Sequence, residues 1–209
     1  MTETIRASER FLLAAIAIFV AVALCGCDLR STLAPPEGSE PLTAADIAFV
    51  AELECGGAWT GDPAEDKARA LLELQAQGIT ITDNPGNPFS DAMAKRDELW
   101  VAGDFFGRPL DVQARILAHE LVHYCQRDLL GDDAFDEATT EARGRWRAEV
   151  PAYLETFRVL KLQGASRSKL HREMRKRVVS MRATYLLKSI PAEQYEAETM
   201  AAWLVVIED

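Results

Sequence analysis

Two histidines, His119 and His123, stand four residues apart in the stretch HELVHYCQ. Residues four apart in a helix lie one turn apart on the same face, so both imidazole rings can bind one metal ion. Glu120 is rotated by about 100° from His119, which lets its carboxylate reach a water on that ion without becoming a close ligand. This pattern demands a helix with a ligand-bearing face, and it constrains the fold more than any other stretch of the chain.

The opposite face of the same helix is apolar, which predicts a buried central helix. Cys125 falls about 240° from His119, on that far face, so it is expected to be a core thiol or part of a disulfide. Val112 and Ile116 share the side of the histidines, which argues against a solvent-exposed pair. The far face, between about 160° and 300° from His119, is formed by Ala114, Leu117, Ala118, Leu121 and Val122.

A catalytic zinc site uses three protein ligands, so a third must come from elsewhere in the chain. Glu149 is the best candidate, because it is a lone acid with apolar and small neighbours in a helical segment that can pack against the first. Glu141 is the second candidate. The acids between residues 128 and 136 crowd into the end of the first helix and are interpreted as solvated charge.

H-E-x-x-H followed by a helix that bears E-x-x-A resembles the gluzincin zinc metallopeptidases, particularly their small bacterial members. The resemblance implies that His119, His123 and Glu149 bind Zn²⁺. It also implies that Glu120 is the general base for a zinc-activated water that hydrolyses a peptide bond. The H-x-x-Q ending at Gln126 is shared with small gluzincins. The chain departs from larger members after the ligand glutamate, where they place an aspartate that orients a histidine.

The oxyanion of such a reaction needs a donor besides zinc. The candidates are Tyr153, His171 and Tyr185, and the sequence does not choose among them. A predicted strand at residues 98–102 precedes the metal-binding helix. In zincins an edge strand in this place pairs with extended substrate, and an ordinary core strand is the equal alternative.

The N-terminal region resembles a bacterial lipoprotein signal. Residues 11–24 contain no polar side chain, and their helical length of about 21 Å is shorter than a bilayer core of about 30 Å, which favours an export signal over a retained anchor. The sequence Leu-Cys-Gly-Cys that ends at Cys27 resembles the lipobox. This resemblance implies a signal peptide over residues 1–26 and a lipid on Cys27. It also implies a location facing the periplasm, with Asp28 favouring the inner membrane. Cleavage by an ordinary signal peptidase, without a lipid, is the alternative.

Two cysteines remain once Cys25 is removed and Cys27 is acylated. An oxidising periplasm permits a disulfide between these two, Cys55 and Cys125. Residues 27–42 are rich in proline and lack periodicity, so they predict a tether, and residues 43–209 form the expected catalytic domain.

The predicted fold is α+β and mostly helical, with a small β-sheet before a zincin-like pair of active-site helices. A break is expected in the long helical region at 137–162, because it contains Gly144 and Pro151. Helices are predicted from Thr43, over 62–77, from an N-cap at Asp111 to 128, over 137–162, over 166–188 and after Pro191, with strands at 79–82 and 98–102.

The net charge of the chain and the basic segment at 166–188 indicate which classes of binding partner to expect. The chain has 23 Lys and Arg against 33 Asp and Glu, a net charge of −10 that disfavours nucleic acid. Residues 166–188 hold eight basic residues and one acid, so this helix either docks on the core with a solvated basic face, contacts anionic lipid, or pairs with acidic surfaces. The expected partners are a peptide substrate and a membrane, and no pattern indicates an oligomeric state. The alternative functions are a non-catalytic envelope lipoprotein and a hydrolase of a non-peptide amide.

Overall fold

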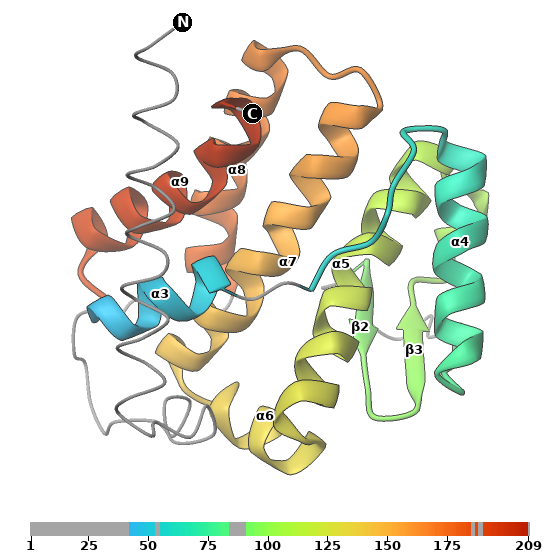
Figure 1. Cartoon of the computed structure of the whole chain (residues 1–209), viewed down its shortest axis with the longest axis horizontal. Coiled ribbons are helices and arrows are strands. Elements are labelled where there is room, and N and C mark those ends of the chain that lie inside the picture. Colours follow the sequence, from blue (N-terminus) through green and yellow to red (C-terminus); the bar gives the residue numbers. More distant parts are fainter. Residues whose placement is uncertain (1–41, 53–54, 84–90, 185–186, 188–189, 209) are drawn as a thin grey trace, which may run out of the picture. The chain divides into compact units, whose positions relative to one another are not determined.

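The computed structural model describes residues 42–52, 55–83, 91–184, 187 and 190–208 (Figure 1). The predicted signal peptide, the lipidation site at Cys27 and the predicted tether up to residue 41 lie outside these residues, as does Tyr185. The last residue assigned to the tether, Leu42, is instead buried and hydrogen-bonded to Gln194, so it belongs to the domain. No helix within the described ranges has the length and hydropathy needed to cross a membrane.

The described part of the chain is α+β and mostly helical, as predicted. Figure 1 shows α4 and the sheet on one side of α5, and α7, α8 and α9 on the other. The helices are α3 (Ala44–Glu52), α4 (Pro63–Ala76), α5 (Leu110–Leu130), α6 (Asp132–Ala138), α7 (Ala142–Leu162), α8 (Arg167–Thr184) and α9 (Ala192–Glu208), with a short 3₁₀ turn at Phe105–Gly107. The strands are β1 (Thr80–Asp83), β2 (Ala92–Ala94) and β3 (Glu98–Val101).

The sheet decides between the two alternatives for the segment at 98–102, in favour of an ordinary core strand. The strand order is β1-β3-β2, with β3 parallel to β1 and antiparallel to β2. Strand β3 therefore lies in the middle of the sheet, with Leu99 and Val101 buried, and cannot pair with a substrate. The edge strand that packs against α5 is β2, a three-residue strand of small side chains and one methionine that has no distinctive sequence pattern.

Helix α5 is the central helix of the domain, and its bounds differ slightly from those predicted. Pro109 is the N-cap, so Asp111 is not a cap but lies in the first turn. There its negative charge interacts favourably with the helix dipole and stabilises the helix. The helix ends at Leu130, before Gly131 with φ of 82°, a left-handed conformation suited to glycine.

Helix α7 shows where the predicted break occurs. The helical region 137–162 is interrupted at residues 139–141, ahead of both Gly144 and Pro151, and α7 then runs through Pro151. Gly144 serves close packing instead, because a Cβ at this position would lie 1.8 Å from the Ala138 carbonyl oxygen. The end of α6 can therefore approach the start of α7 closely.

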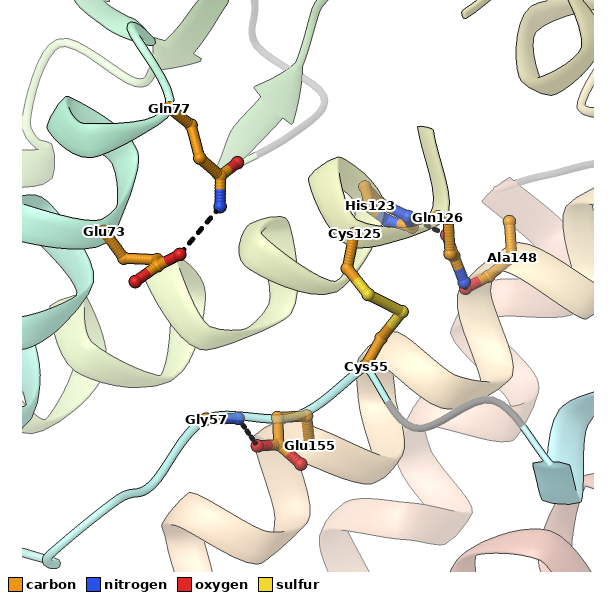
Figure 2. Close-up of a disulfide and its surroundings, with 9 residues drawn as sticks. All are labelled: Cys55, Gly57, Glu73, Gln77, His123, Cys125, Gln126, Ala148 and Glu155. Atoms are coloured by element: carbon orange, nitrogen blue, oxygen red, sulfur yellow. Dashed lines mark hydrogen bonds between the residues drawn. A yellow bond between two sulfur atoms is a disulfide. The ribbon is translucent and has the colours of Figure 1, made fainter. Parts of the chain in front are cut away.

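The segment before α4 holds α5 and α7 together (Figure 2). Cys55 forms the predicted disulfide with Cys125 of α5, with Cα atoms 5.7 Å apart. Two residues later, the Gly57 N–H donates to Glu155 of α7 over 2.9 Å, and the Trp59 indole N–H donates to the same carboxylate. One short segment is thus tied covalently to one helix and by hydrogen bonds to the other.

Candidate metal centre

Three side chains from α5 and α7 converge at one point. The Nε2 atoms of His119 and His123 lie 3.2 Å apart. The Glu149 carboxylate lies 3.4 Å from the His119 Nε2 and 3.9 Å from the His123 Nε2. One ligand atom from each residue lies within 4.8 Å of the other two, so the group can hold a metal ion. The spacing within α5 places both histidines on one face, and the packing of α7 against α5 supplies the glutamate.

The dimensions of this group suit a small tetrahedral ion. Two ligand atoms bound at about 2.0–2.1 Å with a tetrahedral angle lie about 3.3 Å apart, close to the observed separation of the imidazole nitrogens. Two imidazoles and one carboxylate form a ligand set that leaves a fourth position open on zinc. The three residues therefore fit the predicted ion in both chemistry and spacing.

The neighbours of His123 fix the nitrogen that can bind the metal. Gln126 donates its side-chain N–H to the Ala148 carbonyl over 2.9 Å, which turns its own Oε1 toward His123 (Figure 2). The Oε1 atom lies 2.9 Å from the His123 Nδ1 and accepts its proton. The lone pair of His123 therefore resides on Nε2, the atom that faces Glu149 and His119.

His119 lies between the carboxylates and an aromatic ring. Burial lowers the pKa of His119, but its hydrogen bond to Glu149 and the charges of Glu149 and Glu120 outweigh this effect and raise the pKa overall. The Nδ1 atom of His119 has no hydrogen-bond partner among the described residues. The centroids of the Tyr153 and His119 rings lie 4.4 Å apart. Tyr153 therefore restricts the rotation of the His119 ring.

Glu120 lies beside the three converging residues without joining them, as the helical rotation predicts. Its side chain is 5% exposed, and its Oε2 accepts the backbone N–H of Ala94 over 2.8 Å. Burial raises the pKa of Glu120. The hydrogen bond from Ala94 holds the carboxylate between the edge strand β2 and the histidine face of α5.

Of the other candidate residues, the structure brings one next to the centre and leaves two outside it. Glu141 is exposed at the N-cap of α7 and is not part of the converging group, so it is not the third ligand. Tyr153 lies next to His119 on the same helix as Glu149. No contact of the described residues links His171, which is partly exposed on α8, to the centre.

Sequence reasoning did not single out two residues that the structure brings to the surroundings of the centre. Gln126 was noted only as part of a shared motif, although its place one turn after His123 indicated a contact. Arg177 on α8 was counted only as part of the basic helix; its guanidinium carbon lies 4.6 Å from the centroid of the Tyr153 ring. No local sequence pattern distinguishes Arg177 from its basic neighbours.

Comparison of the chain with models of protein families, with curated proteins and with solved structures found no match.

Proposed function

We propose that this chain is a zinc metallopeptidase. The observation that carries the proposal is the convergence of His119, His123 and Glu149, with Glu120 beside them but outside the ligand group. A structural cluster would have no need for a fourth, separately held carboxylate. The H-E-x-x-H sequence and this separation of roles support a hydrolase over a simple metal-storage site.

Zinc bound by these three residues supplies a Lewis acid that lowers the pKa of a bound water. In this proposal Glu120 would accept the proton of that water and return it to the leaving amine. Burial favours this role, because a carboxylate with a raised pKa is a better base than an exposed one. The Ala94 N–H keeps the carboxylate oriented without neutralising it.

The edge strand β2 is the best-placed binding surface for an extended peptide. One side of β2 pairs with β3, and its Ala94 N–H already contacts Glu120. An extended peptide can add to the free side of an edge strand through backbone hydrogen bonds. We infer that a peptide bound there would run next to Glu120, and that β2 has the substrate-pairing role that was one of the two alternatives for residues 98–102.

The proposal also includes attachment to the bacterial envelope through a lipid on Cys27. Its support is the apolar stretch at 11–24 and the lipobox-like sequence that ends at Cys27. The disulfide between Cys55 and Cys125 adds to this support, because disulfides persist in oxidising compartments such as the periplasm.

The variant Glu120→Gln tests the proposal, because an amide keeps the size and accepts the Ala94 N–H but cannot take up a proton. We expect the purified full chain to retain its zinc and its melting temperature. Cleavage of a diverse peptide library should fall by roughly 10²- to 10⁴-fold. Glu141→Gln, the same change at an exposed glutamate of α7, is the control and should cleave as the wild type does. Equal cleavage by the wild type and Glu120→Gln would refute the assignment.

A further inference from the structure

Arg177 lies at the edge of the proposed metal centre. It is partly exposed on α8, and its guanidinium carbon stacks 4.6 Å from the centroid of the Tyr153 ring. The Tyr153 ring in turn lies 4.4 Å from the His119 ring. The two distances share the Tyr153 centroid, so their sum is an upper limit: the guanidinium carbon lies within about 9 Å of the centroid of the His119 ring. Tyr153 thus contacts both the Arg177 guanidinium and the ring of His119, one of the proposed metal ligands.

Among the described residues, no carboxylate oxygen lies within 4.0 Å of an Arg177 nitrogen. The neighbouring Arg172 and Lys176, by contrast, both pair with Glu173. Arg177 is therefore a partly exposed cation at the edge of the proposed metal centre, without a carboxylate partner among the described residues.

We propose that Arg177 forms a subsite that binds a carboxylate of the substrate, one or two residues from the scissile bond. This inference rests on the proposed peptidase function. An extended peptide advances about 3.3–3.6 Å per residue, so a carboxylate one or two residues from a carbonyl at the metal reaches this guanidinium. The planar fork of arginine binds a carboxylate through two parallel hydrogen bonds, and stacking on Tyr153 holds the fork in place. The substrates are thus peptides that end, or carry an acidic side chain, close to the cleaved bond.

The test uses three hydroxamate-capped dipeptides, in which the hydroxamate binds zinc in every case. The first ends in a free carboxylate, the second in a carboxamide, and the third in a carboxamide with an aspartate side chain. Their affinities for the zinc-loaded full chain are measured by isothermal titration calorimetry. We expect the first probe to bind the wild type roughly 10- to 100-fold more tightly than the second, as a charge-assisted bond does. The third probe should show the same preference over the second, because the fork of arginine binds a side-chain carboxylate as it binds a terminal one.

Three variants locate the effect. Arg177→Gln should abolish the preference for the acid, and Arg177→Lys should keep part of it because the charge remains. Arg175→Gln removes an equal charge from an exposed position of the same helix and should leave the preference unchanged. Equal affinity of the wild type for the first and second probes would overturn the subsite, and this measurement needs no variant. A preference for the first probe that survives in Arg177→Gln would overturn it as well.

Metal analysis and peptide hydrolysis on the same samples separate this inference from the proposed function. A chain that binds no zinc refutes both. Zinc with no preference for the acid refutes the subsite alone. A preference for the acid without hydrolysis of any peptide supports the subsite and refutes the peptidase function.

Discussion

Replacing Gln126 with methionine should weaken zinc binding while the domain still folds. Gln126 is 1% exposed and joins two groups, accepting from the His123 Nδ1 and donating to the Ala148 carbonyl, each over 2.9 Å. Methionine has nearly the same shape but makes neither hydrogen bond. Each buried polar group left without a partner costs about 1–3 kcal/mol of stability. The metal affinity should fall by about 10- to 100-fold, because His123 is no longer held in the tautomer with a free Nε2.

A second variant separates the two hydrogen bonds of Gln126. Gln126→Glu still accepts from the His123 Nδ1 but cannot donate to the Ala148 carbonyl while ionised. It should therefore lose stability and keep most of its zinc affinity. The comparison of Gln126→Met with Gln126→Glu assigns the metal effect to His123 rather than to a general loosening of the two helices.

The control is Gln113→Met, which makes the same substitution at a second buried glutamine of α5. Gln113 is also 1% exposed and donates to the Arg108 carbonyl over 2.6 Å, away from the metal ligands. This variant should lose stability and bind zinc as the wild type does. Zinc affinity is measured on the full chain by competition with a chelator, and stability by urea unfolding of the metal-free protein. Wild-type zinc affinity in Gln126→Met would refute the reasoning.

Three further predictions concern the disulfide, the pH dependence of zinc binding and the lipid on Cys27. Replacing Cys55 and Cys125 together with serine should lower the free energy of unfolding by about 4 kcal/mol, because their bond closes a loop with a sequence separation of 70 residues; urea unfolding measures this, and an unchanged midpoint would contradict it. The apparent zinc affinity should rise as the pH is raised through and above about 6.5, the ordinary pKa of histidine, because zinc must displace a proton from His119, whose pKa is raised in the metal-free protein. Chelator competition that shows a flat profile would contradict this prediction. Radiolabelled fatty acid should enter the wild type and not Cys27→Ser, and persistent labelling would place the lipid elsewhere.

The metal-binding group was predictable because its main signal is local. His119, His123 and the rotation of Glu120 follow from the geometry of a single helix. Glu149 depends on the packing of α7 against α5, which the sequence indicates only through the apolar residues around that glutamate. The disulfide followed from the number of cysteines that remained, not from any knowledge of the distance between them.

The parts that sequence reasoning missed depend on tertiary contacts. The place of β3 in the middle of the sheet is set by pairing order, which alternation along one strand does not encode. Gly144 was interpreted as a helix breaker, although its role is to admit the Ala138 carbonyl at close range. Arg177 is one of several basic residues in a single helix, and only the packing of α8 places it next to Tyr153.

The central claim is that His119, His123 and Glu149 hold a zinc ion, and X-ray absorption at the zinc edge of the purified full chain tests it most directly. The wild type should show one zinc per chain with two imidazole nitrogens and carboxylate oxygen in its first shell, at about 2.0–2.2 Å. Glu149→Gln should weaken zinc binding, and Glu120→Gln should leave the spectrum of the ligand shell unchanged. A shell that contains sulfur, or a wild-type shell that persists in the His119→Ala, His123→Ala double variant, would contradict the account.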